Sequence, residues 1–240
     1  MNTRPDPEPW QKNDAPVWQS PEVYYQRLAP DYDAARFNNS YGQYLDLQER
    51  RWLTRWLQPY QGGAILDLAC GTGRLLNLAT HGLDLSDAMV REARRKYPDK
   101  LLHCSPAQEM AQLGVQFDAV FCLHLFMHLP PSELETIVKA CEPWVRRGGV
   151  LIMDAPSAWR RRLIRFQPSG WHGATSFTAD QMKTIAGTGW RLRFIRGLLF
   201  FPVHRIPARF RSWFRPVDYF LGTTPLKWFS SYTLYCLERQ

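Results

Sequence analysis

Short apolar runs alternate along this chain with segments in which apolar side chains recur at helical spacing. Seven runs have the length and composition of buried strands, and they cover residues 64–69, 82–85, 101–104, 117–123, 149–154, 191–198 and 232–237. The segments between many of these runs have the pattern of helices. Strands that alternate with helices form βαβ units, so the pattern predicts an α/β fold with a largely parallel sheet.

Residues that favour helix ends mark several of the helical segments. Apolar positions between Tyr41 and Leu57 recur mostly at helical spacing, and Gly62 and Gly63 follow them, while residues 24–39 are expected to be helix and loop. The predicted helix starts are Ser20 before Pro21, Ser86 for a helix that ends near Tyr97, and two capping boxes, Ser132 with Glu135 and Thr178 with Gln181.

The domain organisation follows from these elements. Residues 1–19 are polar and contain four prolines, which predicts a flexible tail. Residues 20–60 are expected to form an N-terminal helical cap and residues 61–240 a core, with an insertion at about 199–229 before the last strand. A length of 240 residues and a hydrophobic content of 45% suit one domain with additions.

The cysteines and the polar N-terminal residues indicate the cellular compartment of the protein. The five cysteines include no Cys-x-x-Cys pair, and several lie in apolar runs, which favours a reducing compartment and argues against disulfides or a zinc site. The polar, Pro-rich start is unlike a signal peptide, and no apolar run approaches the ~20 residues of a membrane span. The expectation is a soluble, cytoplasmic protein.

The net charge of +8 is unevenly distributed. Residues 156–217 hold twelve Lys/Arg against the single acid Asp180, which indicates an anionic partner or surface. Within 200–221 an Arg-rich apolar stripe runs through Ile206, Phe210, Trp213, Phe214, Val217 and Leu221. Such a segment can lie on an anionic membrane, or it can pack on the core as a lid over the active site, and both interpretations stay open.

The chemistry is concentrated in four segments. In 66–75 a buried strand enters a glycine-rich turn and then a helix start, an arrangement that lets a backbone approach a ligand but also serves as a simple tight turn. Leu76 stands where an NAD-binding fingerprint requires glycine. Asp84 ends the second strand, where it can accept both hydroxyls of a ribose or merely cap a helix. The remaining segments are 117–130, with His124 and His128, and 144–154.

In this order and spacing, the four segments resemble the class I S-adenosylmethionine (SAM)-dependent methyltransferase family, most closely its small-molecule branch with the ubiquinone and menaquinone methyltransferases. The resemblance covers residues 41–154 and continues loosely beyond them. It implies a doubly wound sheet of seven strands with a Rossmann-like topology, SAM as the cofactor, and transfer of a methyl group to a small molecule. The stretch between Gly73 and Asp84 is shorter than in relatives, which implies a truncated first helix.

The resemblance also assigns cofactor contacts, residue by residue. Asp67 and the backbone of Ala69, Cys70, Gly71 and Gly73 would hold the methionine end of SAM. Asp84 would bind the ribose, Leu85 and Met89 would flank the adenine, and Cys122 and Leu123 would contact the cofactor through their backbone. At the adenine edge, where relatives commonly carry Asp-Ala, this chain has Pro106-Ala107, and Gln108 is the candidate to replace the missing acid.

The acceptor side is less defined. A general base is needed for a hydroxyl or carbon acceptor, and His128 is the preferred candidate over His124, although a structural role fits either. Tyr24, Tyr32 and His172 are expected near the substrate. Magnesium-dependent relatives carry an acid after the fourth strand, where Cys122 and Leu123 stand, so no metal is expected.

Other functions stay open as alternatives. Nucleic-acid amino methylation is disfavoured, because the motif that relatives use for it is absent after the fourth strand. The basic C-terminal half keeps an RNA substrate as an alternative. A SAM-binding protein without catalysis and an NAD-dependent oxidoreductase are two further alternatives. The oligomeric state is not predicted.

Overall fold

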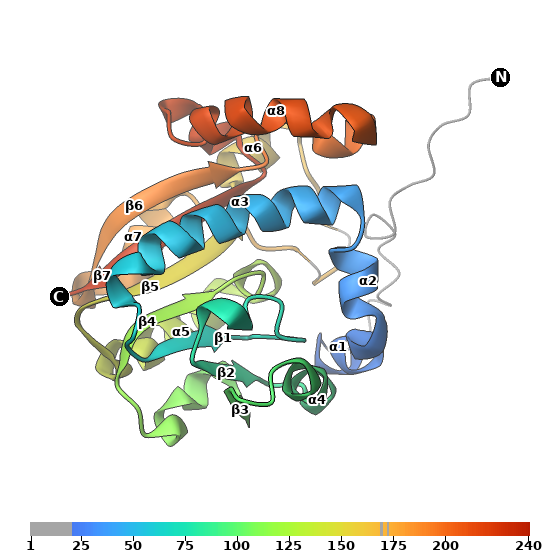
Figure 1. Cartoon of the computed structure of the whole chain (residues 1–240). Coiled ribbons are helices and arrows are strands. Elements are labelled where there is room, and N and C mark those ends of the chain that lie inside the picture. The colour runs from blue at the N-terminus through green and yellow to red at the C-terminus, as the bar shows by residue number, and fades with distance from the viewer. Residues whose placement is uncertain (1–20, 169, 172) are drawn as a thin grey trace.

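A computed structural model describes residues 21–168, 170–171 and 173–240. The predicted tail, the Ser20 cap and His172 lie outside the described residues. A single sheet of seven strands in the order β3-β2-β1-β4-β5-β7-β6 forms the centre of the molecule (Figure 1). Strands β1 to β5 pair in parallel, whereas β7 runs antiparallel to both of its neighbours. The predicted α/β fold with a largely parallel sheet is therefore confirmed.

The strands lie close to the predicted ranges. Their bounds are β1 (Ile65–Leu68), β2 (His81–Asp84), β3 (Leu101–Cys104), β4 (Phe117–Cys122), β5 (Val145–Pro156), β6 (Trp190–Leu198) and β7 (Tyr232–Arg239). The four residues of β1 are all buried, as expected for a strand in the middle of a parallel sheet covered on both faces.

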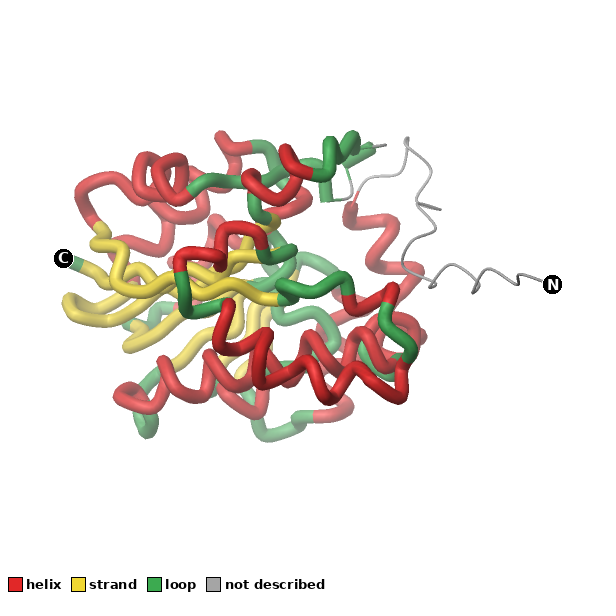
Figure 2. The backbone as a smooth tube through the Cα atoms, turned by 90° about the horizontal axis from the view of Figure 1, so that it is seen from above, coloured by secondary structure: helices red, strands yellow, loops and turns green. Residues whose placement is uncertain are grey.

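Helices cover both faces of the sheet, as the view from above shows (Figure 2). The α-helices are α1 (Pro21–Leu28), α2 (Tyr32–Arg36), α3 (Ser40–Leu57), α4 (Asp87–Lys96), α5 (Pro131–Cys141), α6 (Ala158–Leu163), α7 (Ala179–Ala186) and α8 (Ala208–Leu221). Short 3-10 turns connect many of them: η2 (Ala29–Asp31), η3 (Gln58–Tyr60), η4 (Leu76–Leu78), η5 (Ala107–Leu113), η6 (Phe126–His128), η7 (Glu142–Trp144), η8 (Gly187–Gly189), η9 (Val203–Arg205) and η10 (Pro225–Phe229).

Two hydrophobic cores result from this arrangement. On one face of the sheet, α3, α4 and η4 pack on inward-facing strand residues such as Ile65 and Phe121. On the other face, α5, α7 and η5 pack on residues such as Leu66 and Val120. Neighbouring strand residues thus contribute to opposite cores, which is the alternation expected of a strand and the reason that the sheet is doubly wound.

The helix caps test the predicted starts. Ser86 accepts a hydrogen bond from the Met89 N–H at the start of α4, and Thr178 and Gln181 form the predicted capping box of α7. The predicted box of Ser132 with Glu135 is wrong. The N-cap is Pro130 and helix α5 begins at Pro131, two residues earlier than the box predicts, because proline lacks an N–H and presets the helical φ angle at the first position.

Two departures from regular βαβ geometry concern segments singled out above. The helix after β1 is reduced to the single turn η4, in agreement with the short spacing between Gly73 and Asp84. The segment between β6 and β7 contains η9, α8 and η10, and α8 packs against α3 and β6. Among the described residues, no helix is long and apolar enough to cross a membrane.

The apolar stripe predicted in 200–221 is divided between the two sides of α8. Trp213 and Val217 are exposed, whereas Phe214 contacts Phe201 and Leu221 is half-buried. The helix therefore packs on the body of the protein with only part of the predicted stripe.

Candidate active site

The glycine-rich turn after β1 forms one wall of the site. Left-handed backbone conformations produce the tight bend of this turn. The φ angles of Ala69, Gly71 and Gly73 are 60°, 53° and 85°. A Cβ atom built on Gly71 would meet nothing within 4 Å, so this position leaves space for a ligand. A Cβ atom on Gly73 would come within 2.8 Å of Leu76 Cδ1, so Gly73 is required for packing of the turn rather than for the cavity.

A cavity of about 380 Å³ lies at the carboxyl ends of β1, β2 and β4. This is where open α/β sheets bind ligands, and the volume lies within the range of small-molecule sites. Eight of the predicted cofactor residues line the cavity: Ala69, Gly71, Asp84, Leu85, Met89, Ala107, Gln108 and Leu123. His124, His128 and Tyr32 line it as well.

Other predicted site residues do not form part of the lining. Four predicted cofactor residues are in this group: Asp67, Cys70, Gly73 and Cys122. Tyr24 instead accepts a hydrogen bond from Arg36 Nη2 at 2.7 Å. No residue of 199–229 contributes to the lining among the described residues, so the predicted role of this insertion as a lid stays a prediction.

Two aspartates, the buried Asp67 and the half-buried Asp84, lie beside the glycine turn. Asp84 Oδ2 accepts the Gly71 N–H at 2.7 Å, and Asp84 Oδ1 accepts the Ser86 N–H at 2.9 Å. Burial raises the pKa of Asp84, although these two backbone donors oppose the rise. Burial also raises the pKa of Asp67 well above its usual value, and its carboxylate accepts no hydrogen bond from the described residues. A cationic or hydrogen-bonding ligand would therefore stabilise both carboxylates in their charged form.

His124 contacts a buried cluster of charged side chains, which consists of Glu49, Arg74 and Asp154. Glu49 of α3 is fully buried, and its two carboxylate oxygens lie 2.7 Å from His124 Nε2 and 2.7 Å from Arg74 Nη2. Asp154, at the end of β5, accepts the His124 backbone N–H at 2.7 Å, and its other oxygen lies 3.6 Å from His124 Nδ1. These contacts hold His124 in a left-handed conformation with a φ angle of 64°, which is rare for a residue other than glycine.

The cluster sets the charge of its members. Burial alone would raise the pKa of Glu49, but the His124 and Arg74 cations outweigh it and lower the pKa to about 2. Burial would lower the pKa of His124, but the Glu49 and Asp154 carboxylates raise it above the usual value. His124 is thus held as an imidazolium at the cavity wall over more of the pH range than a free histidine.

His128 occupies a different environment on the far side of the cavity. Its Nδ1 accepts the Gly173 N–H at 3.0 Å, and its Nε2 lies 3.0 Å from the Tyr25 hydroxyl oxygen. Because Nδ1 is an acceptor, a neutral His128 carries its proton on Nε2 and donates it to Tyr25. Burial raises the pKa of Tyr25 well above its usual value, with Tyr32 adding to the rise, so this hydroxyl stays protonated.

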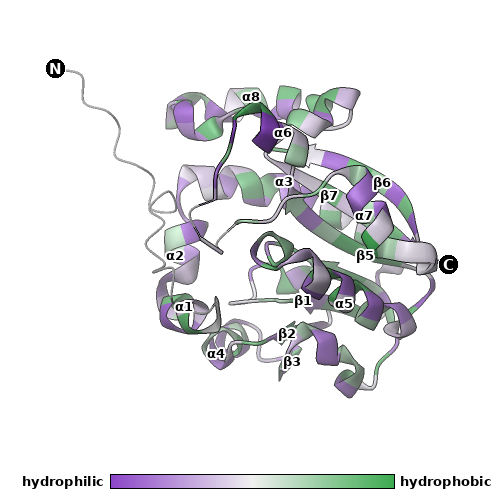
Figure 3. Cartoon of the chain, turned by 180° about the vertical axis from the view of Figure 1, so that it is seen from behind, coloured by the Kyte–Doolittle hydropathy of each residue, from purple (hydrophilic) through white to green (hydrophobic). Residues whose placement is uncertain are grey.

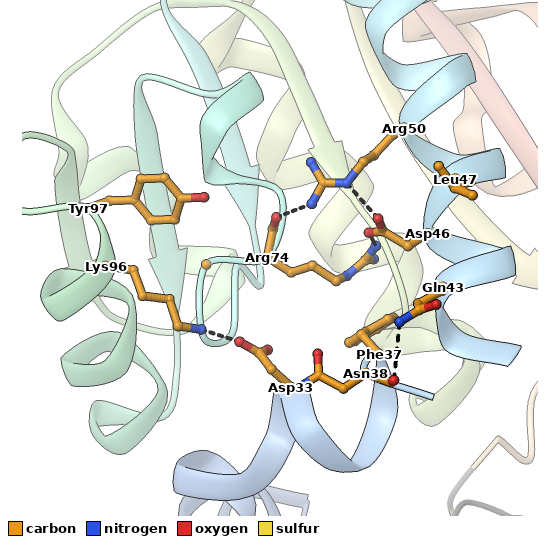
Figure 4. Close-up of a pocket in the computed structure, with 11 residues that line it drawn as sticks. Asp33, Phe37, Asn38, Gln43, Asp46, Leu47, Arg50, Arg74, Lys96 and Tyr97 are labelled. Atoms are coloured by element: carbon orange, nitrogen blue, oxygen red, sulfur yellow. Dashed lines mark hydrogen bonds and ion pairs between the residues drawn. The ribbon is translucent and has the colours of Figure 1, made fainter. Parts of the chain in front are cut away.

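A network of polar contacts locks the N-terminal helices onto the glycine turn around a second, polar hollow of about 500 Å³ (Figure 4). Asp33 of α2 accepts a hydrogen bond from Thr72 Oγ1 at 2.6 Å and pairs with Lys96 of α4. Arg50 and Asp46 of α3 pair at 2.7 Å on the other side of this hollow. The helices α1 and α2 thereby bring Tyr25 and Tyr32 over the cavity.

Sequence reasoning missed three residues of the site. Glu49 could have been found, since it lies four residues from both Leu45 and Leu53 and so occupies the buried face of the predicted helix. Tyr25 was passed over for its neighbour Tyr24, and the local pattern does not distinguish the two. Glu133 lines the cavity from α5, but a first-turn acid of a helix has no local signal for such a role.

Comparisons with known proteins bear directly on this site. The methyltransferase domain family matches residues 65–149, which include the glycine turn, Asp84, His124 and His128. The chain is 33% identical over 88 residues to magnesium-protoporphyrin O-methyltransferase of Synechocystis, a match that covers 32% of this chain and 38% of the relative. It is also 33% identical over 92 residues to demethylmenaquinone methyltransferase of Bacteroides fragilis, covering 35% and 37%. The matches thus span less than two-fifths of either relative.

The fold extends the likeness over the whole chain. The crystal structure of magnesium protoporphyrin IX methyltransferase from Synechocystis with bound SAH covers 91% of this chain and 98% of that chain, with a TM-score of 0.63 and 18% sequence identity. Residues 65–149 thus match the methyltransferase domain family, and the chain has the fold of this SAH-binding neighbour. The matched domain contains the glycine turn and Asp84, while the N-terminal helices and the insertion with α8 lie outside it.

Proposed function

We propose that this protein transfers a methyl group from SAM to a small-molecule acceptor. The observation that carries the proposal is the Asp84 carboxylate beside the open backbone of Gly71, in the cavity at the carboxyl edge of the sheet. Together with the family assignment, it supports a nucleoside-type cofactor bound as in other doubly wound folds.

The residues present fit SAM. Asp84 would accept the ribose hydroxyls, and the buried Asp67 carboxylate, which no described residue pairs by hydrogen bond, would accept the ammonium group. Leu85 and Met89 would enclose the adenine, with Gln108 at its polar edge. When bound, SAM supplies an electrophilic methyl group on a cationic sulfur. The remaining contribution of the chain is to align the acceptor and to exclude water.

The acceptor would lie against Tyr25 and His124. The Tyr25 hydroxyl, which accepts from His128, would donate to an acceptor oxygen. The Nε2 atom of His124 is engaged by Glu49, so the imidazolium would act through its positive charge and favour the anionic form of that oxygen as the methyl group is transferred. The two hydrogen bonds of His128 favour a positioning role for it, through Tyr25, over the general-base role considered from the sequence. His124 and Tyr25 would then be the catalytic residues.

The chemistry of the wall narrows the class of acceptor. Leu125, Leu129 and Ile137 form an apolar side of the cavity, which suits an aromatic or lipophilic molecule with at least one polar atom. The two relatives named above carry the names of ring compounds, magnesium-protoporphyrin and demethylmenaquinone, which agrees with this class. The five cysteines are unpaired, which supports a cytoplasmic location.

Calorimetric titration with SAM tests the proposal. Wild-type protein should bind SAM and not NAD, and Asp84→Asn should weaken SAM binding by about tenfold or more because it removes a charge-assisted acceptor. Asp87→Asn is the matched control, since Asp87 is half-exposed at the start of α4, pairs with Arg91 outside the cavity lining and should leave the affinity unchanged. Asp84→Asn protein that is folded and binds SAM as tightly as wild type would refute the assignment.

Turnover is tested separately from binding. Purified protein with SAM and a panel of phenolic and quinol-type metabolites should release S-adenosylhomocysteine with at least one acceptor. Binding of SAM without turnover on any acceptor, including an extract of cellular metabolites, would favour a SAM-binding protein without catalysis. Methylation of RNA in the same assay would favour the RNA alternative.

A further inference from the structure

Helix α8 faces solvent with its apolar side. Trp213, Val217 and Phe220 follow one another at helical spacing and are 73%, 48% and 66% exposed. The charged residues Arg211 and Asp218 point inward instead, with only 7% and 0% of their surface exposed. A surface helix of a globular protein ordinarily has the opposite arrangement, so this orientation requires a cause.

The orientation is held by hydrogen bonds rather than by loose packing. Asp218 Oδ2 accepts from the Tyr44 hydroxyl of α3 at 3.0 Å, and Asp218 Oδ1 accepts the Phe200 N–H at 2.8 Å. Arg211 Nη1 donates to Ser40 Oγ, also of α3, at 2.7 Å. Rotating α8 to cover its apolar side would break the bond between the buried Asp218 carboxylate and the buried Tyr44 hydroxyl, and a buried polar group without a partner is costly. The exposure of Trp213 and Phe220 is therefore built into the fold.

A second exposed apolar segment lies next to α8. In and after α6, the side chains of Trp159, Leu163, Ile164 and Phe166 are exposed. The turn η10, with exposed Leu226 and Phe229, contacts both α6 and α8. Figure 1, from the front, and Figure 3, from behind, both show α6 beneath α8. Figure 3 also shows hydrophobic and hydrophilic positions side by side on α8. We call the exposed residues of α6, α8 and η10 the outer face.

The chain around the outer face is positively charged, which indicates an anionic partner. Between residues 157 and 231 the only acids are Asp180, on α7, and the buried Asp218. Exposed arginines, among them Arg162 and Arg209, accompany the apolar side chains of the outer face. The exposed aromatic rings of the outer face would suit bases or lipid alike, but its exposed aliphatic side chains, such as Leu163 and Val217, cannot stack on bases and suit an acyl-chain boundary. Arginine and tryptophan suit the layer of headgroups above it.

We propose that the outer face is a docking surface for an anionic lipid bilayer. Trp213, Phe220 and Leu163 enter the headgroup and upper acyl region, and Arg162 and Arg209 pair with lipid phosphates. The attachment is peripheral, reversible and sensitive to salt, as expected for partial insertion of a few side chains assisted by charge.

The outer face is connected to the candidate active site. Arg161 of α6 donates to the carbonyl oxygens of Ala174 and Thr175 at 3.2 and 3.0 Å, and the neighbouring Gly173 N–H donates to His128. The Trp171 ring lies 5.4 Å from the His128 ring. A protein docked through the outer face would thus hold this side of the cavity near the bilayer, where a lipid-soluble acceptor resides. This last consequence rests on the proposed function, whereas the docking itself does not.

Co-sedimentation with lipid vesicles tests the docking without SAM or turnover. The full chain should sediment with vesicles rich in phosphatidylglycerol at low salt, and much less with pure phosphatidylcholine vesicles or at raised salt. Trp213→Ser combined with Phe220→Ser should weaken binding by about tenfold or more, because both side chains lose their apolar insertion. Arg209→Gln should weaken it by about fivefold.

The controls use exposed residues elsewhere on the surface. Leu101→Ser removes a 57% exposed leucine from β3, the opposite edge of the sheet from β6, and Arg95→Gln removes an exposed arginine of α4. Both should bind vesicles as wild type does. Circular dichroism and SAM titration verify that each variant is folded. Absence of binding to anionic vesicles at low salt, or equal binding by the Trp213/Phe220 variant and wild type, would overturn the proposal, as would binding to RNA in place of vesicles.

Discussion

Glu49→Gln keeps the shape of a fully buried side chain and removes the charge that pairs with both Arg74 and His124. The pKa of Glu49 falls from 4.5 to about 2 in the folded protein. At 1.36 kcal/mol per pKa unit, this shift corresponds to about 3 kcal/mol of stability above pH 4.5. Breaking a buried ion pair by removing one partner costs about 3–5 kcal/mol, which agrees with this magnitude. We expect the variant to lose about 3 kcal/mol of its free energy of unfolding.

The loss should depend on pH in a specific way. Glu49 has a lowered pKa, so its contribution is present above pH 4.5 and is lost as the pH falls toward 2. His124 has a raised pKa, so its contribution is present below pH 6.5 and is lost as the pH rises through the folded-state value. The difference in stability between wild type and Glu49→Gln should therefore be largest between pH 4.5 and 6.5 and smaller at alkaline pH.

Urea unfolding followed by circular dichroism at several pH values measures this difference. Thermal unfolding should show a midpoint lowered by about 6–12 °C, given about 2–4 °C per kcal/mol for a chain of this size. Glu135→Gln is the matched control, because Glu135 pairs with Lys139 on the exposed side of α5 and should cost no more than about 0.5 kcal/mol. Equal destabilisation by the two substitutions, or a difference that does not vary with pH, would refute the account of the buried cluster.

Four further predictions concern the cavity and the core. Gly71→Val should abolish most SAM binding in calorimetry, because the added side chain would enter the cavity. Gly114→Val is the control, since Gly114 has a similar φ angle but lies outside the cavity. Equal SAM affinities of the two variants would show that Gly71 does not face the cofactor. Tyr25→Phe should slow turnover by at least about tenfold with SAM affinity retained. If His128 positions Tyr25, His128→Gln, which can still donate, should retain more turnover than His128→Ala, and equal losses would contradict that role. Phe121 is fully buried, so Phe121→Ala should lower the free energy of unfolding, measured in urea, by about 3–5 kcal/mol. A loss below about 1 kcal/mol would mean that the surrounding core closes around the smaller side chain and leaves no cavity.

Local features of the chain were predictable because they depend on neighbouring residues. The seven strands and the start of α4 at Ser86 follow from apolar runs and from one capping side chain. The glycine turn and Asp84 are recognisable for the same reason, since a strand, a turn and a helix start are contiguous in the sequence. The start of helix α5 was misplaced by two residues, because a serine cap at Ser132 competes with proline at the first helical position, Pro131, and the backbone constraint of proline prevailed.

The acceptor side of the cavity depends on contacts between distant segments. Glu49 and His124 lie 75 positions apart, and only the packing of α3 across the end of β4 brings their side chains together. Tyr25 and His128 meet in the same way, through the attachment of α1 and α2 to the glycine turn. No short-range pattern encodes such pairs, so sequence reasoning could name the histidines but not the groups that set their protonation.

The direction in which α8 faces was decided entirely by tertiary structure. The composition of residues 200–221 indicated an apolar, arginine-rich helix and left open whether its stripe pointed inward or outward. The choice depends on Tyr44 and Ser40, which lie more than 170 positions away and whose side chains form hydrogen bonds with Asp218 and Arg211. Amphipathic spacing defines the sides of a helix, but the polar groups of its neighbour in space determine which side becomes buried, because a buried polar group must find a partner.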